Sequence, residues 1–302
     1  MDTRGRERVL RVVEVGDREC TCETETTGYV VPGTTLSLRR RDHVVAKGEV
    51  GPLPATPQWL SIRPGDLVDL VRGEEPGLDA VMDDEGEIVQ PASVGCSLPE
   101  VFRCVRVGER IFFDDGRIGG AIQSVAEDRI RVEITSAAGG AAKLRGEKGI
   151  NLPDSDLDLP ALTEKDIEDL AFVAGHGDMV ALSFVQRRED VERLLAELAR
   201  LGNRPLGMVL KIETQRAFER LPLLLLAAKR QAPVAVMAAR GDLGVEVGFE
   251  RLSEVQEEIL WICEAAHVPV IWATQILESL AKGGMPSRAE VTDAAMGAAP
   301  NA

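Results

Sequence analysis

The feature that most constrains the fold is a regular alternation of short apolar runs with longer amphipathic segments, between residues 163 and 274. Apolar runs of this length are typical of strands that are buried on both faces of a parallel sheet. Sequences that alternate such strands with helices fold as α/β layers. We therefore predict the α/β fold class, with four strands that make half of an eightfold β/α barrel. The predicted strands are 179–185, 206–213, 233–239 and 268–274.

Helices are predicted between these strands because the intervening segments repeat their apolar residues at helical spacing. Thr163 is expected to cap the first helix, with Asp166 three positions later to complete the cap. Two further helical stretches are expected to begin at Leu277 and Ser287. One helix is predicted before the first strand, at 163–173, and three between the strands, at 189–201, 216–230 and 252–266.

The chain before residue 150 has a different pattern, with short alternating runs separated by turn residues. This pattern is typical of a small antiparallel barrel or sandwich. We predict a β-rich domain over residues 1–150 and a partial barrel over residues 151–302. The small residues 137–142 are interpreted as a flexible link, and the basic segment 143–148 as a hinge. The predicted strands lie within 8–15, 34–38, 63–71, 106–116, 117–125 and 129–134.

Charged residues end two of the predicted parallel strands. Lys211 and Glu213 end one strand, and Arg240 and Asp242 follow another. Lys211 and Glu213 are two positions apart, so both point to the same side of a strand. The carboxyl ends of barrel strands are where α/β barrels keep their chemistry, and a lysine with two carboxylates suits a divalent cation and a phosphate. The alternative is that these charges are solvated and that Arg-Gly-Asp is an ordinary turn.

Composition excludes several classes of partner. The chain has 302 residues, 50 acidic and 35 basic, for a net charge of −15. An acidic chain without a dense basic stripe is a poor binder of nucleic acid and of anionic membranes. No apolar run is long enough for a membrane span, and the mixed N-terminal sequence predicts a cytoplasmic protein. The five cysteines are irregularly spaced and predict no disulfide framework, and none of the three histidines is assigned to catalysis.

Several motifs at the strand ends and in the preceding segment occur together, in a fixed order. They are Glu147-Lys-Gly-Ile-Asn-Leu-Pro153, Leu162-Thr-Glu-Lys-Asp166, Lys211-Ile-Glu213, Ala239-Arg-Gly-Asp-Leu-Gly-Val-Glu246, Val270-Ile-Trp-Ala-Thr-Gln-Ile-Leu-Glu278 and Pro286-Ser-Arg-Ala-Glu290. In order and rough spacing, these motifs resemble the pyruvate kinase family. The resemblance covers Val101–Ala295, about two thirds of the chain.

The resemblance implies a partial TIM-type (β/α) barrel preceded by a β-rich lid domain similar to the β-barrel domain of pyruvate kinases. It implies a glycolytic phosphotransferase that converts phosphoenolpyruvate and ADP to pyruvate and ATP. Mg²⁺ is the implied cofactor, with K⁺ as the family's monovalent cation. Phosphoryl transfer asks the protein mainly for positioning and charge neutralisation.

By the same resemblance, Glu213 and Asp242 would hold Mg²⁺. Lys211 would be catalytic and would neutralise charge on the transferring phosphoryl group and on the enolate oxygen. The backbone amides of Gly241 and Asp242 would bind the substrate carboxylate at the start of a helix. Thr274 would donate its hydroxyl to that carboxylate or help to protonate the enolate.

Two further residues are weaker candidates. Ser183, at the end of another strand, would line the substrate pocket. Lys148 lies in the basic segment near the domain junction, where it would touch a nucleotide phosphate; a solvated loop is the alternative there. Trp272 occupies a position where the family commonly has a small residue, which indicates a divergent branch.

The family pattern is incomplete in this chain. The family's two motifs before the lid, which supply an arginine for phosphate and most K⁺ ligands, have no counterpart here, and Met296–Ala302 replaces the last barrel strand. We expect a truncated barrel that is inactive alone, or one completed by a homo-oligomer or a partner chain. The alternatives are a Mg²⁺-dependent oxo-acid lyase on a similar barrel, which ADP dependence would distinguish, and a non-catalytic pyruvate-binding remnant.

Overall fold

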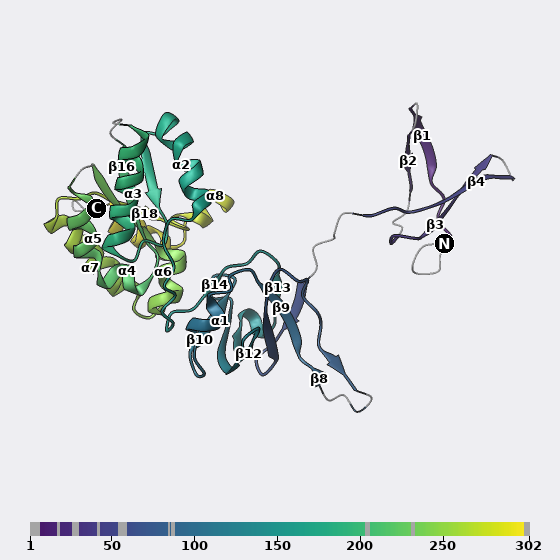
Figure 1. Ribbon diagram of the computed structural model, residues 1–302, viewed down its shortest axis with the longest axis horizontal. Helices are drawn as coiled ribbons and strands as arrows, with labels where there is room; N and C mark the ends of the chain where they lie inside the picture. Colours follow the sequence, from purple (N-terminus) through teal and green to yellow (C-terminus); the bar gives the residue numbers. More distant parts are fainter. Residues whose placement is uncertain are drawn as a thin grey trace. The chain divides into compact units, whose positions relative to one another are not determined.

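A computed structural model describes residues 7–16, 19–25, 30–40, 43–53, 59–83, 85, 88–202, 206–230 and 233–298. The chain divides into two compact units between Gln58 and Trp59, and each is described by itself (Figure 1). The second unit has two separate hydrophobic cores, one built from residues 60–152 and the other from residues 162–268. The division at residue 150 that the sequence suggests stays a prediction.

The first unit contains two antiparallel hairpins whose described side chains are exposed to solvent. Val15 is 78% exposed and Leu38 is 51% exposed, although both belong to strands. A two-stranded hairpin has no face on which to build a core, so its apolar side chains stay in water. The strands predicted within 8–15 and 34–38 are confirmed. The hairpins pair β1 (Arg11–Val15) with β2 (Cys20–Glu23), and β3 (Thr35–Arg40) with β4 (His43–Glu49).

A six-stranded sheet in the order β14-β10-β11-β12-β6-β9 surrounds the first core of the second unit. Its pairs are antiparallel except for β6 and β9, which are parallel. The β-rich character expected for this part of the chain is confirmed. Its elements are β5 (Trp59–Ile62), β6 (Leu67–Arg72), β7 (Val81–Met82), β8 (Ile88–Gln90), β9 (Ala92–Cys96), α1 (Val101–Cys104), β10 (Arg110–Phe113), β11 (Ile118–Val125), β12 (Arg129–Ala137), the 3₁₀ turn η1 (Ala138–Gly140), β13 (Ala142–Arg145) and β14 (Ile150–Asn151).

The interpretation of residues 137–148 as a flexible link and a basic hinge is wrong for most of that segment. Residues 138–140 form a 3₁₀ turn, and the four residues after Ala141 form β13, which pairs with β5. Leu144 faces the core, whereas the Lys143 ammonium lies 4.0 Å from the centre of the Trp59 ring. The segment Ala142-Lys-Leu-Arg145 alternates buried apolar and exposed basic residues, as a strand with one face on a core does.

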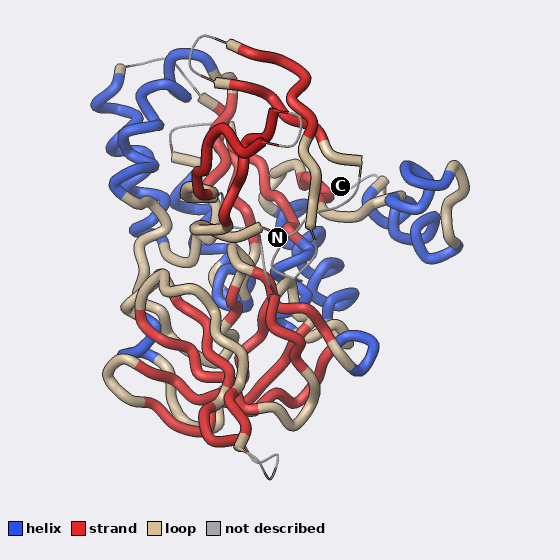
Figure 2. Tube along the Cα trace, turned by 90° about the vertical axis from the view of Figure 1, so that its right-hand side faces the viewer, coloured by secondary structure: helices blue, strands red, loops and turns tan. Residues whose placement is uncertain are grey.

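The second core of this unit lies around a parallel sheet in the order β15-β16-β17-β18, which confirms the predicted strand and helix series. In Figure 2 helices accompany these strands, whereas the antiparallel sheet carries few. The elements are α2 (Glu164–His176), β15 (Met179–Leu182), α3 (Arg188–Leu201), β16 (Gly207–Ile212), α4 (Gln215–Glu219), α5 (Leu221–Ala228), β17 (Val234–Ala239), α6 (Arg240–Val247), α7 (Leu252–Ala265), β18 (Val270–Ala273), α8 (Glu278–Gly283) and α9 (Arg288–Gly297).

Helix α2 begins as its sequence predicts. The Thr163 hydroxyl accepts from the Asp166 amide at 3.1 Å, and the Asp166 carboxylate accepts from the Thr163 amide at 2.8 Å. Such a reciprocal cap satisfies two amides that have no partner within the helix, and it stabilises a helix by about 1 kcal/mol.

The single helix predicted over 216–230 is wrong, because the segment forms two helices that meet at Arg220. Pro222 lies in the first turn of the second helix, α5. Proline has no amide hydrogen to donate and its ring clashes with the carbonyl four residues earlier, so it starts a helix far better than it continues one. The apolar periodicity runs through both helices and therefore conceals the break.

Across the described ranges, the helices are all too short or too polar to cross a membrane.

Candidate functional site

Three of the predicted site residues meet at the carboxyl ends of β15 and β16. These strands pair in parallel, with Leu182 opposite Leu210, so the residues that follow them are neighbours. The Lys211 ammonium lies 2.7 Å from Glu213 Oε1 and donates a hydrogen bond to Ser183 Oγ at 2.9 Å. Glu213 is only 3% exposed, whereas the Lys211 side chain is 25% exposed and reaches solvent. The structure thus places a buried carboxylate beneath a lysine that a ligand can reach.

A backbone amide that the sequence does not reveal completes the surroundings of Glu213. The Phe184 amide donates to Glu213 Oε2 at 2.5 Å, so each oxygen of the buried carboxylate has a donor. Phe184 has φ of 49°, a left-handed backbone that is rare for a large side chain. Strained residues of this kind gather at functional sites. A phenylalanine after a strand gives no sequence signal of such a conformation, so this donor could not have been predicted.

Gly241 and Asp242 lie in the first turn of α6, which follows β17 without an intervening loop. The helix start expected at this motif is therefore confirmed. The Asn151 amide group, on β14, donates to Asp242 Oδ1 at 3.4 Å. Asp242 therefore links the beginning of α6 to the antiparallel sheet, a contact that the sequence does not signal.

Thr274 follows β18 and packs against the same turn. A Cβ atom added to Gly241 would lie 3.3 Å from the Thr274 methyl group, which places these two predicted substrate groups side by side. Thr274 has φ of 76°, and Gln275 and Leu277 are also left-handed. A β-branched residue rarely adopts this conformation, so the turn after β18 is held in place by its surroundings.

Glu246 is a buried carboxyl group on α6 that sequence reasoning missed. It is 9% exposed, and its pKa is raised to about 7. Burial is the main cause of the raised pKa, and the negative charge of Asp242 raises it further. A hydrogen bond from the Gln215 amide and the positive charges of Arg110 and Arg216 lower it, but they do not offset burial. A carboxyl group that exchanges its proton near neutral pH is typical of functional sites, although buried structural groups show the same shift.

Lys148 pairs with an aspartate that follows β10. Its ammonium is 2.7 Å from Asp114 Oδ1. Its predicted contact with a nucleotide phosphate stays a prediction.

The groups that could hold a metal ion are the carboxylates of Glu213 and Asp242. In the part of the chain that the structure describes, no cluster of three or more histidine, cysteine, aspartate or glutamate side chains has the geometry of a metal site. Mg²⁺ needs fewer protein ligands, since it keeps several waters and binds through one or two carboxylates together with substrate phosphates. The donor chemistry of these two residues therefore fits Mg²⁺.

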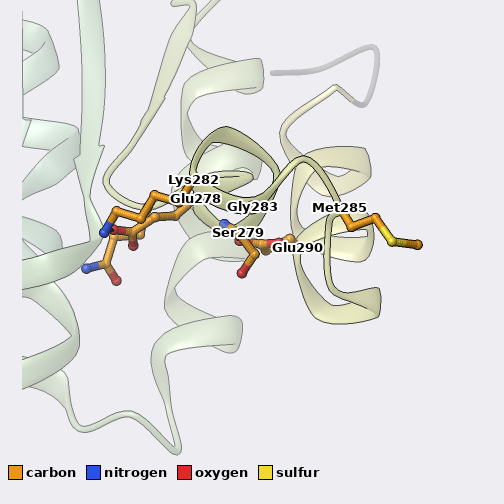
Figure 3. A pocket seen from close by; sticks show the side chains of 7 residues that line it. Glu278, Ser279, Lys282, Gly283, Met285 and Glu290 are labelled. Atoms are coloured by element: carbon orange, nitrogen blue, oxygen red, sulfur yellow. Dashed lines mark hydrogen bonds and ion pairs between the residues drawn. The ribbon is translucent and has the colours of Figure 1, made fainter.

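A hollow of about 630 Å³ lies beside the Thr274 turn, between α8 and α9 (Figure 3). Its polar groups pair with one another: Lys282 pairs with Glu278, and the Ser279 amide donates to Glu290 Oε1 at 2.5 Å. Figure 3 shows Met285 pointing away from the other side chains. The lining therefore does not converge on a ligand.

Comparisons with known proteins show which family this chain resembles. A family model described as pyruvate kinase, barrel domain, matches residues 65–299. The chain is 36% identical over 204 residues to pyruvate kinase PKLR of Homo sapiens, which covers 67% of this chain and 34% of that protein. It is 40% identical over 189 residues to a pyruvate kinase of Mycobacterium tuberculosis, covering 62% of this chain and 38% of the relative. The chain thus spans little more than a third of the length of these relatives.

Proposed function

Because this chain belongs to the pyruvate kinase family, we propose that its strand ends carry out phosphoryl transfer between phosphoenolpyruvate and ADP. The observation that supports this most directly is the contact of Lys211 with Glu213 and Ser183 at the carboxyl end of the parallel sheet. The four strands would form part of a TIM-type barrel, and residues 59–152 would act as its lid. As a glycolytic enzyme the protein would work in the cytoplasm.

Lys211 would stabilise negative charge on the transferring phosphoryl group and on the enolate oxygen that forms as pyruvate leaves. Its ammonium already sits against a buried carboxylate, which fixes its position before a ligand arrives. Preorganised charge of this kind stabilises a transition state because it needs no rearrangement during the reaction. Ser183 would hold the ammonium from the other side, since its hydroxyl accepts from Lys211.

Gly241 and Asp242 would present backbone amides of the first turn of α6 to the substrate carboxylate, as helix N-termini do for anions. Thr274, which packs against Gly241, would add a hydroxyl group on the same side. Glu213 and Asp242 would hold Mg²⁺. When bound, this ion would neutralise phosphate charge and bring the substrate oxygens to the site.

The partners proposed for the whole reaction are phosphoenolpyruvate, pyruvate, ADP and ATP, with Lys148 as the candidate contact to the nucleotide. K⁺ is also proposed from the family, although the residues that usually bind it have no counterpart in this sequence. These points rest on family membership alone.

The test is pyruvate formation from phosphoenolpyruvate by the purified chain, with and without ADP, MgCl₂ and KCl. We expect turnover that needs ADP and Mg²⁺ and that falls at least about 100-fold in Lys211→Met, since removing one preorganised charge from a transition state has effects of this size. Lys165→Met is the matched control, because Lys165 is a 70% exposed lysine paired with Asp169 on α2. It should leave turnover unchanged.

Other outcomes would change the proposal in definite ways. Product formation without ADP would indicate a lyase. A folded wild-type chain that binds phosphoenolpyruvate but does not turn it over would be a binding remnant. A chain that is folded and does neither would contradict the proposed function.

A further inference from the structure

The carboxyl ends of β17 and β18 are tied together by a buried arginine that the proposed reaction does not use. Arg240 is only 10% exposed, and its guanidinium pairs with the carboxylate of Asp293 on α9. The same guanidinium donates to two backbone carbonyls, that of Ala273 at 3.0 Å and that of Thr274. Arginine suits this position because its planar group presents five donors in a rigid fork.

Trp272, the residue that sets this sequence apart from the family pattern, belongs to the same cluster. Its indole Nε1 donates to Asp293 Oδ1 at 3.2 Å, and the Arg240 guanidinium carbon lies 5.4 Å from the centre of its ring. A Cβ atom added to Gly297 would lie 2.9 Å from Trp272 Cγ, so the backbone of α9 is packed tightly against the indole. Trp272 thus fixes Asp293 through a hydrogen bond and fixes Arg240 through stacking.

The bonds of this cluster end on the strained turn that carries Thr274. The carbonyl that Arg240 holds belongs to Thr274 itself, and Thr274, Gln275 and Leu277 all have positive φ. A turn with three left-handed side-chain-bearing residues persists only where its surroundings determine its conformation. The two hydrogen bonds from Arg240 to backbone carbonyls hold the turn in this conformation. Without them the turn would relax toward ordinary backbone angles.

The geometry points to Arg240, Asp293 and Trp272 as positioning residues that hold Thr274 beside Gly241, so that its hydroxyl can serve a ligand carboxylate. We call these three residues the clamp. The ligand in this statement rests on the proposed function, whereas the effect of the cluster on the turn does not. One hydroxyl and two helix-start amides at fixed positions suit a planar carboxylate adjacent to an oxygen, as in an enolate of a 2-oxo acid. By holding Thr274 in place, the clamp would increase the affinity for the carboxylate end of the ligand.

Hydrogen exchange of residues 273–277 tests the clamp without any ligand. Trp272→Phe keeps the aromatic ring but removes the indole donor, and Arg240→Lys keeps the charge but removes the fork. Both variants should exchange the amides of this turn about tenfold faster, since local opening costs less once its bonds are lost. Trp261→Phe, which changes a 58% exposed tryptophan on α7, is the matched control and should leave the turn unchanged. Unchanged exchange in both clamp variants would overturn the inference.

Calorimetric titration with phosphoenolpyruvate and MgCl₂ then tests whether the clamp acts through Thr274. Trp272→Phe should weaken binding about fivefold, which is the size of one lost hydrogen bond. In a Thr274→Ala background the same substitution should have almost no further effect, because residues that act through one group are not additive. Equal losses in both backgrounds would overturn the positioning role. Faster exchange in a chain that does not bind phosphoenolpyruvate would contradict the proposed function and leave the clamp intact.

Discussion

Each of the two cores of the second unit has a buried carboxylate beside it, and the two carboxylates have different partners. In the antiparallel sheet, Asp69 is completely buried and receives hydrogen bonds from Arg129 and Arg131 on the neighbouring strand. In the parallel sheet, Glu213 is held by one lysine and one backbone amide. Asp69 is thus paired with two positive charges, whereas Glu213 is paired with one cation, Lys211, which also reaches solvent.

The difference follows from where the two carboxylates lie on their strands. Asp69 is in the middle of β6, directly opposite Arg131, so both arginines cross from the adjacent strand β12. Their hydrogen bonds outweigh burial, which alone would raise the pKa, and the pKa of Asp69 is lowered. Glu213 comes one residue after the end of β16, beside a lysine that reaches solvent. One carboxylate is therefore enclosed by charges from a neighbouring strand, whereas the other lies next to a solvent-accessible cation.

The largest effect is expected from Asp69→Ala. This change leaves two arginines without their shared carboxylate, and breaking a buried pair costs about 3–5 kcal/mol. We expect a value near about 3 kcal/mol, because both arginine side chains are already partly exposed and can turn toward water. Urea unfolding followed by circular dichroism measures the loss. A change below about 1 kcal/mol would mean that Asp69 is not a stabilising centre.

Glu246 is another buried carboxyl group, and the positive charges near it do not offset the effect of burial on its pKa. Its folded pKa of about 7 is above the ordinary value, so the folded state holds the proton more tightly than the unfolded chain. The contribution of Glu246 to stability is then fully present below about pH 4.3 and is lost as pH rises to about 7, at up to about 1.4 kcal/mol for each pH unit.

Unfolding free energies at pH 5 and pH 8, measured in EDTA to exclude metal ions, would show this fall. Glu246→Gln should remove it, because the amide does not titrate. Asp69 should change the unfolding free energy in the opposite direction, and only at acidic pH. Because its pKa is lowered, its stabilising contribution is present above about pH 4 and is lost as pH falls further. A wild-type chain that is equally stable at pH 5 and pH 8 would contradict the description of Glu246.

Glu213→Gln should have a smaller effect on stability, about 1 kcal/mol. The glutamine oxygen can still accept from the Phe184 amide, and the Lys211 ammonium, which is 25% exposed, can turn to solvent. Thermal unfolding of this variant beside Asp69→Asn checks the comparison directly. If Glu213→Gln were the more destabilising of the two, Glu213 would be a stabilising group like Asp69.

The smallest effect is expected from the acidic segment between the two cores. Asp156 pairs with Arg216 on α4, but the aspartate side chain is 65% exposed. Exposed ion pairs contribute about 0–1 kcal/mol and are screened by salt. Asp156→Asn should therefore change the unfolding free energy by less than about 0.5 kcal/mol, and the difference should disappear in 1 M NaCl. A larger, salt-resistant loss would mean that this pair is desolvated.

The sequence predicts the local parts of this structure well. The Thr163 cap involves residues three apart, and the strand and helix series of 163–274 follows from apolar spacing. Lys211 and Glu213 could be placed on one side of a strand end because two-residue periodicity is a local property. The meeting of Ser183 with Lys211 also follows, once β15 and β16 are paired in parallel.

What could not be predicted depends on distant residues or on unusual backbone angles. Arg240 and Asp293 are 53 positions apart, so their pairing requires the packing of α9. The left-handed backbones of Phe184 and Thr274 are imposed by tertiary contacts against local preference. β13 pairs with β5, about 80 positions earlier in the chain, so its partner could not be read from local spacing.

If Glu213 serves a ligand and Asp69 serves the fold, calorimetric titration of Mg²⁺ in the presence of phosphoenolpyruvate should separate the two. Wild-type protein should bind Mg²⁺, Glu213→Gln should reduce this affinity at least about tenfold, and folded Asp69→Asn should bind as wild type does. Equal binding by wild type and Glu213→Gln, or no binding by the folded wild-type chain, would contradict these two roles.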